Sequence, residues 1–221
     1  IVEYEINSVP NSYSVKIESN SDILSDIQCR LDKNPKNVLV VDKNIKELYL
    51  KKLDIDKSRI FTVEPSEKFK TLDNGVMKLL DFLADADFTK KEEMIAVGGG
   101  ITEDIAAFAG ACFKRGIKWI FYPTTLLSMC DSCIGGKTGI NYHNTKNQVA
   151  LFSAPREVVI NINFIKTLSD FDIKSGMGEI LKLSVTGGND FLNIYEQAVT
   201  DGRINNFENY RELILSALAV K

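Results

Sequence analysis

One stretch of the sequence, residues 122–147, concentrates side chains that bind anions or take part in acid–base chemistry. It reads YPTTLLSMCDSCIGGKTGINYHNTKN. The polar groups and glycines of interest are Asp131, Lys137, Lys146, Asn141, Asn147, Gly135, Gly136 and Gly139. Glycine adopts positive φ without strain and lets a ligand approach the backbone closely, so cations and amides beside glycines indicate a bound anion. A turn-rich loop with solvated lysines is the alternative that composition alone leaves open.

A second candidate anion site lies at residues 98–104. Gly98–Gly100 follow an apolar strand pattern and precede a helical pattern that opens at Ile101. Free N–H groups and the dipole at the start of a helix favour a phosphate. The spacing is not GxGxxG, so a tight turn that lets the helix pack on the strand is the alternative.

Three further features are weaker. Glu179 and Lys182 share one face of a predicted helix, where an exposed ion pair is the simpler interpretation. Cys130 and Cys133 form a lone CxxC, which lacks the four ligands of a structural zinc site and is interpreted as packing. His143, the one histidine of the chain, is predicted to lie in a loop and not to bind a metal.

Alternating strand and helix patterns predict the elements that position these residues. Strands are expected at 37–42, 59–63, 94–97, 119–123 and 158–162, after an antiparallel hairpin of 2–6 and 13–18 with a turn at 10–12. Helices are expected at 21–31, 45–53, 65–84 with Ser66 as N-cap, and from Ile101. This order predicts an α/β fold with a mainly parallel, Rossmann-like sheet, whose ligands lie beyond the carboxyl ends of the strands.

Beyond residue 168 the strand patterns stop. Helices are predicted at 176–184, 190–199 and 206–221, so we divide the chain into an α/β domain (1–167) and the beginning of an all-helical domain (168–221). The chain starts at Ile1 and ends within a helical pattern, and we therefore expect the natural protein to be longer.

Composition excludes several classes of protein. The 221 residues carry a formal net charge of −3 and no basic stripe, which argues against nucleic acid as a partner. No apolar run is long enough to cross a membrane, and no signal peptide is evident. Four cysteines in a chain of this size do not form a disulfide framework, so a reducing cytoplasm is predicted.

Several segments together resemble the 3-dehydroquinate synthase family and its sugar phosphate cyclase relatives. They are GGGITEDIAAFAGACFKRGI, PTTLLSMCDSCIGGKTGIN, TKN and SGMGEILK, in that order along nearly the whole chain. The resemblance implies an NAD-dependent lyase that converts 3-deoxy-D-arabino-heptulosonate 7-phosphate to 3-dehydroquinate and phosphate, in the shikimate pathway. NAD would be used and regenerated within one turnover, and Zn2+ or Co2+ would bind the reacting hydroxyl.

The resemblance also implies roles for individual residues. NAD would contact Asp42, Asn44, Glu67, Lys70, Gly99, Gly100, Ile101, Asp104, Thr124, Thr125, Lys137, Lys146 and Thr167. Substrate binding and catalysis would involve Asp131, Lys137, Lys146, Asn147, Lys182 and Lys221. Arg115 would reach the phosphate in a neighbouring subunit's site, which implies a homodimer. Glu179 would be a metal ligand.

The metal site is where the chain departs from the family pattern. The family's two histidine ligands have no counterpart here, so this polypeptide is expected to bind metal poorly and not to turn over by itself. Three alternatives stay open: a sister cyclase of the valiolone or scyllo-inosose type, a glycerol-dehydrogenase-like oxidoreductase, and a non-catalytic dinucleotide-binding relative. The intact GGKTG favours the quinate branch, and the lysine density argues against a simple alcohol as substrate.

Overall fold

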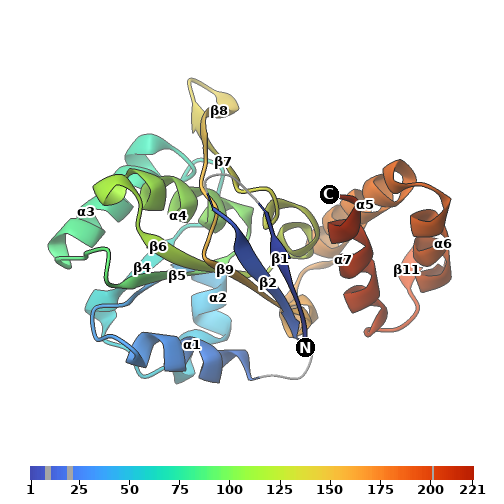
Figure 1. Ribbon diagram of the computed structural model, residues 1–221, viewed down its shortest axis with the longest axis horizontal. Helices are drawn as coiled ribbons and strands as arrows, with labels where there is room; N and C mark the ends of the chain where they lie inside the picture. Colours follow the sequence, from blue (N-terminus) through green and yellow to red (C-terminus); the bar gives the residue numbers. More distant parts are fainter. Residues whose placement is uncertain (8–10, 19–21, 201) are drawn as a thin grey trace.

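The seven-stranded sheet that carries the site is mainly parallel, as the alternation of strands and helices predicts (Figure 1). The computed structural model describes residues 1–7, 11–18, 22–200 and 202–221. In sheet order the strands are β1 (Val2–Ile6), β2 (Tyr13–Glu18), β9 (Glu157–Asn161), β6 (Lys118–Pro123), β5 (Glu93–Gly98), β3 (Val38–Asp42) and β4 (Ile60–Val63). Only β1 runs antiparallel to its neighbour, so the predicted hairpin is confirmed, although residue 10 of its turn lies outside the described residues.

Helices on both faces bury the central strands. Figure 1 shows α1 (Ile23–Asp32) and α2 (Lys43–Leu48) on one side of the sheet, and α3 (Met77–Asp85) and α4 (Gly100–Cys112) on the other. All five residues of β3 are buried, as are those of β9. A strand covered on both faces is mostly apolar, which explains the continuous runs in the sequence; the buried polar residues Asp42, Glu157 and Asn161 lie at the ends of β3 and β9.

Two predicted helix starts are wrong, those at residues 65 and 176, and a third, at about residue 45, is off by two residues. The helix expected at 176–184 begins at Asp170, where Ser169 caps it. The helix expected from residue 65 with Ser66 as N-cap begins later, because residues 66–70 form tight turns and Thr71 caps the segment Leu72–Val76 that leads into α3. The helix expected from 45 begins at Lys43, because the Asp42 carboxylate accepts the N–H of Asn44 at 2.7 Å. The helix predicted from residue 21 is α1, capped by Asp22; residue 21 itself lies outside the described part of the chain.

A hairpin that was not predicted begins inside the candidate anion-binding stretch 122–147 and extends to Phe152. Strands β7 (Lys137–Tyr142) and β8 (Thr145–Phe152) pair antiparallel and project above the sheet in Figure 1. His143 and Asn144, at φ 45° and 61°, form its two-residue turn, as the twist of a hairpin requires. His143 is therefore in a turn, as predicted. Inside the hairpin, a Cβ on Gly139 would lie 2.7 Å from the Cβ of Asn147.

Short helical turns connect several of these elements. They are η1 (Leu50–Lys52), η2 (Lys57–Arg59), η3 (Leu72–Val76), η4 (Phe113–Arg115), η5 (Ser128–Ser132) and η6 (Ile162–Thr167). Of these, η5 matters most for the site, because it carries Asp131 and Ser132 at the carboxyl end of β6.

The last part of the chain is mostly helical, as predicted. It comprises α5 (Asp170–Gly187), α6 (Asn189–Ala198) and α7 (Asn209–Val220), with a two-residue ladder of β10 (Val199–Thr200) and β11 (Arg203–Ile204). Helix α5 approaches the α/β part so closely that a Cβ on Gly176 would lie 2.5 Å from Leu126. None of the helices formed by the described residues is long and apolar enough to cross a membrane. The division at residue 168 stays a prediction.

A buried ionic network joins α1 to the sheet. Arg30, 8% exposed, lies 2.8 Å from Glu157 and 3.2 Å from Asp26, and its guanidinium stacks over Tyr122. Glu157 also contacts Lys16 at 2.7 Å. Burial disfavours the charged form of Glu157, but hydrogen bonds from Arg30 and Lys16 outweigh this effect and lower its pKa.

Replacing Arg30 by Ala should therefore destabilise the fold strongly, because the Glu157 and Asp26 carboxylates lose a buried cation. We expect a loss of about 3–5 kcal/mol in the free energy of unfolding, measured by urea denaturation. Arg156→Ala is the matched control, because the Arg156–Glu93 pair has a half-exposed guanidinium and should contribute less than about 1 kcal/mol. Equal losses in both variants would contradict the structural role of the network.

Replacing Gly139 by Ala should open the β7–β8 hairpin, because its Cβ would collide with the backbone and side chain of Asn147. We expect a loss of about 1–3 kcal/mol, the usual cost of overpacking. Gly178→Ala is the control: a Cβ at this helical position meets nothing within 4 Å, and we expect a gain of about 0.5–1 kcal/mol. Thermal unfolding measures both, and a neutral Gly139→Ala would show that the hairpin is looser than described.

Candidate active site

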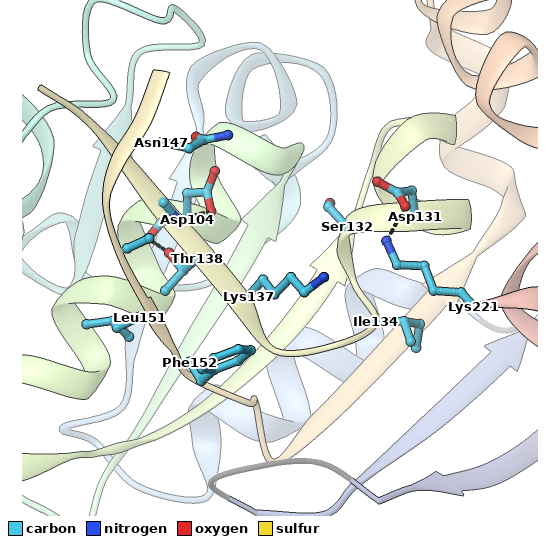
Figure 2. Close-up of a pocket in the computed structure, with 12 residues that line it drawn as sticks. Asp104, Asp131, Ser132, Ile134, Lys137, Thr138, Asn147, Leu151, Phe152 and Lys221 are labelled. Atoms are coloured by element: carbon cyan, nitrogen blue, oxygen red, sulfur yellow. Dashed lines mark hydrogen bonds and ion pairs between the residues drawn. The ribbon is translucent and has the colours of Figure 1, made fainter. Parts of the chain in front are cut away.

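A cavity of about 540 Å³ lies at the carboxyl ends of the strands, where the parallel sheet predicts a ligand (Figure 2). It is bounded by α4, by η5, by the β7–β8 hairpin and by Lys221 after α7. The lining residues are Asp104, Asp131, Ser132, Ile134, Lys137, Thr138, Gly139, Asn147, Ala150, Leu151, Phe152 and Lys221. Five of the residues predicted to bind substrate or cofactor therefore meet here: Asp104, Asp131, Lys137, Asn147 and Lys221.

The two lysines of the cavity differ in their partners. Lys221 forms an ion pair with Asp131, which joins the end of the chain to η5. The ammonium of Lys137 has no ion-pair or hydrogen-bond partner among the described residues, and Figure 2 shows it extending from β7 toward the side occupied by Asp131 and Lys221. Lys137 is thus a cation available to an anionic ligand.

Asp104 is held in the cavity wall by contacts from two other segments. Its carboxylate lies 2.8 Å from the ammonium of Lys70, which is only 6% exposed, and accepts the Gly139 N–H at 2.9 Å. The backbone carbonyl of Asp104 also accepts the Thr138 hydroxyl. Lys70 in turn donates to the amide oxygen of Asn147 at 2.7 Å. These contacts join α4, the turn before Thr71 and the hairpin into one unit.

A second cavity of about 580 Å³ is lined by the turn before Thr71 and by the tip of the hairpin. It is lined by Glu67, Lys68, Thr71 and residues 141–146. Glu67 accepts from the amide of Asn141 at 2.7 Å and pairs with Lys146 at 3.1 Å. Burial raises the pKa of Glu67, but these two hydrogen bonds outweigh it and leave the pKa below its usual value. Lys146 therefore lines the second cavity, whereas Lys137 lines the first.

The glycines of the run 98–100 differ in their surroundings. A Cβ on Gly98 would lie 2.4 Å from the Thr102 hydroxyl oxygen, so this glycine permits strand and helix to pack. A Cβ on Gly100 would meet only the Ser132 hydroxyl, at 3.6 Å, and no side chain caps the start of α4. The buried hydroxyl of Thr102 has no hydrogen-bond partner among the described residues. A free helix start with an unpartnered buried hydroxyl fits a phosphate group.

The remaining predicted cofactor residues surround the same sheet edge. Asp42 ends β3 and is buried, which raises its pKa, while Asn44 is exposed in α2. Thr124 donates its N–H to Gly98, and the Thr125 hydroxyl is hydrogen-bonded to Ser128. Thr167 is hydrogen-bonded to Tyr49 at 2.7 Å.

Glu179 and Lys182 form the ion pair expected from their spacing on α5. No group of three or more His, Cys, Asp or Glu side chains converges in the part of the chain that the structure describes. These residues therefore do not form a complete metal centre by themselves. Cys130 and Cys133 are buried and unpaired, as predicted for packing residues.

Arg115 does not join either cavity. It follows α4, at φ 63°, and precedes the start of β6, at the opposite edge of the sheet from the carboxyl ends.

Several lining residues were not predicted. Thr138, Leu151 and Phe152 belong to the missed hairpin, and Ser132 lies in η5. Residues 149–152 read Val-Ala-Leu-Phe, a short continuous apolar run that could have indicated part of β8. The buried Glu103, which accepts a hydrogen bond from Ser132, carries no signal that separates it from other helical glutamates.

Comparison with known proteins identifies the family. Residues 60–175 match the model of the 3-dehydroquinate synthase N-terminal family. A 3-dehydroquinate synthase of Pelagibacter ubique is 38% identical over 199 residues, covering 86% of this chain and 53% of the relative. One of Idiomarina loihiensis is 37% identical over 168 residues, covering 74% and 47%. The chain thus spans about half the length of the curated relatives it matches.

Solved structures agree on the fold. A 2-deoxy-scyllo-inosose synthase, solved with carbaglucose-6-phosphate, NAD+ and Co2+, superposes with a TM-score of 0.83 at 21% identity, over 100% of this chain and 62% of that one. A 2-epi-5-epi-valiolone synthase of Streptomyces hygroscopicus, solved with NAD+ and Zn2+, gives 0.81 at 20% identity, over 98% and 62%. At this identity the likeness shows the sugar phosphate cyclase fold, and the family follows from the sequence matches. The chain belongs to the 3-dehydroquinate synthase family.

Proposed function

We propose that this chain carries the NAD-binding part and much of the substrate cleft of a 3-dehydroquinate synthase. The reaction is the conversion of 3-deoxy-D-arabino-heptulosonate 7-phosphate to 3-dehydroquinate and phosphate, in the shikimate pathway. The observation that carries the proposal is the 540 Å³ cavity, which places the unpaired Lys137 beside the Asp131–Lys221 pair and Asn147. A substrate with both a carboxylate and a phosphate needs such fixed cations in a partly enclosed cleft.

NAD is the proposed dinucleotide. The start of α4 at Gly99 and Gly100 would hold its phosphates. Glu67 and Asp42 would accept hydrogen bonds from its ribose hydroxyls, because both side chains are carboxylates near the carboxyl ends of the strands. When bound, the cofactor supplies reversible hydride transfer. Two of the related structures were solved with NAD+, which supports this assignment.

Glu179 is the residue that we propose as a ligand to a divalent metal, Zn2+ or Co2+. It lies on α5 and pairs with Lys182, and no group of three or more His, Cys, Asp or Glu side chains converges around it among the described residues. A carboxylate alone does not hold a catalytic metal, which needs three protein ligands. We therefore assign Glu179 as one ligand of a site that the described residues do not complete.

We further propose a cytoplasmic homodimer in which Arg115 binds the phosphate of the partner's substrate. Arg115 is exposed at the edge of the sheet opposite its own cavity, so a second copy could reach it. All four cysteines are free, which is compatible with a reducing compartment.

A sister cyclase is the second candidate, because the solved structures reported above are cyclases of the inosose and valiolone types. The curated relatives at 37% and 38% identity favour the quinate reaction.

Phosphate release tests the proposal directly. The natural protein that contains this sequence is incubated with NAD+ and Zn2+ or Co2+, and with 3-deoxy-D-arabino-heptulosonate 7-phosphate, sedoheptulose 7-phosphate or glucose 6-phosphate. We expect release from the first substrate alone, without net NADH. Release only from sedoheptulose 7-phosphate or glucose 6-phosphate would move the protein to a sister branch. NADH formed from a simple polyol, with no phosphate released, would overturn the cyclase assignment.

Replacing Lys137 by Ala should lower kcat/KM for that substrate about 100- to 1,000-fold, the usual effect of removing one fixed charge-stabilising group from an active site. The cause is the loss of the cavity's unpaired cation. Lys118→Ala is the matched control, because Lys118 is exposed at the other end of the sheet, at the start of β6. Steady-state kinetics measures both, and normal turnover by Lys137→Ala would show that the cavity is assigned wrongly.

A further inference from the structure

Glu103 is a buried carboxyl at the site for which the proposed function has no role. It lies in the first turn of α4 and is 6% exposed. Its carboxyl accepts a hydrogen bond from the hydroxyl of Ser132, the residue after Asp131. No Lys or Arg lies within ion-pair distance of it among the described residues.

The groups that face Glu103 are mainly acidic. Asp104 follows it on α4, Asp131 faces it from η5, and Lys221 faces it from the end of α7. Tyr13 of β2 and Cys133 complete the set. Lys221 is already paired with Asp131, so it does not neutralise a second carboxylate.

These surroundings favour the neutral form. Burial is the largest effect, because it disfavours the charged carboxylate, and the nearby Asp104 and Asp131 act in the same direction. The pKa of Glu103 therefore lies well above its usual value. The Ser132 hydrogen bond and the charge of Lys221 lower the pKa, but by less than burial raises it. The partial positive charge at the helix start also opposes it, but this effect is smaller than complete burial.

The Glu103–Ser132 hydrogen bond joins α4 and η5, two segments that form walls of the cavity. Ser132 lines the cavity and lies 3.6 Å from the position of a Cβ on Gly100, so the Glu103–Ser132 bond sets how closely η5 approaches the start of α4. We propose that Glu103 is a positioning residue: its neutral carboxyl holds the Asp131–Ser132 turn against α4, and it does so without placing an anion beside a ligand phosphate at the helix start. The ligand in this proposal, NAD+, rests on the proposed function.

Stability as a function of pH tests the neutral form without any ligand. A carboxyl whose pKa is raised in the folded state contributes stability that is fully present below its unfolded pKa, about 4.3 for Glu, and lost as the pH rises through the folded pKa. Glu103→Gln keeps the shape but cannot ionise. We expect its stability relative to wild type to grow as the pH rises above that value, in urea denaturation at a series of pH values. A relative stability that falls with pH would show that Glu103 is ionised when folded and would overturn the proposal.

Binding of NAD+, measured by isothermal titration calorimetry, tests the positioning role. We expect Glu103→Gln to bind within about threefold of wild type, and Glu103→Ala and Ser132→Ala to bind at least tenfold more weakly, with the double variant no weaker than the worse single one. Glu92→Ala is the matched control: Glu92 is also buried, but it lies at the opposite edge of the sheet, where it binds Thr89.

The outcomes separate the two proposals. Three results would overturn the positioning role. Glu103→Gln could lose as much NAD+ affinity as Glu103→Ala, or Glu103→Ala could keep the wild-type affinity. The third result is that the control Glu92→Ala loses as much affinity as Glu103→Ala. If wild type itself does not bind NAD+, the cofactor assignment fails and the positioning role fails with it, while the pH series still decides whether Glu103 is neutral.

Discussion

The buried ion pair of Asp104 with Lys70 is the interaction on which both cavities depend. Taking two charges out of water is costly, and the cost is offset only when the geometry is good and the remaining polar atoms are satisfied. Here Gly139 donates to the same carboxylate, and Lys70 also binds Asn147. Because these contacts come from α4, from the turn before Thr71 and from the hairpin, breaking one of them would leave a charge uncompensated and loosen the wall between the two cavities.

Most of the cations that make the sequence look like an anion site already have partners in the described structure. Lys70 pairs with Asp104, Lys146 with Glu67, Lys182 with Glu179 and Lys221 with Asp131. Lysine density therefore overstates the positive charge that a ligand would meet. Lys137 differs because it has no ion-pair partner among the described residues. Each of the other lysines would have to leave its carboxylate partner to contact an anionic ligand. Because each of these lysines has a carboxylate partner, its positive charge is neutralised while no ligand is bound.

The three glycines show how one short motif meets two demands. Gly98 gives room to Thr102, so that strand and helix can pack, whereas Gly100 leaves the start of α4 open. Close packing and an open helix start thus belong to different residues of the run. The helix start is then available to a phosphate because no side chain caps it.

The sequence by itself determined the α/β class, the parallel core strands, the sheet edge at which the cavity lies and the family, since buried strands are mostly apolar and the motif at residues 123–141 is long. It did not determine the β7–β8 hairpin, the late start of α3 or the separation of Lys146 from Lys137. These depend on contacts between residues distant in the chain: Asn141 binds Glu67 and the Lys70 carbonyl, which draws residues 66–70 into a turn and holds the hairpin over α4. Local patterns report which face of an element is buried, but only the tertiary structure decides which buried charge meets which partner.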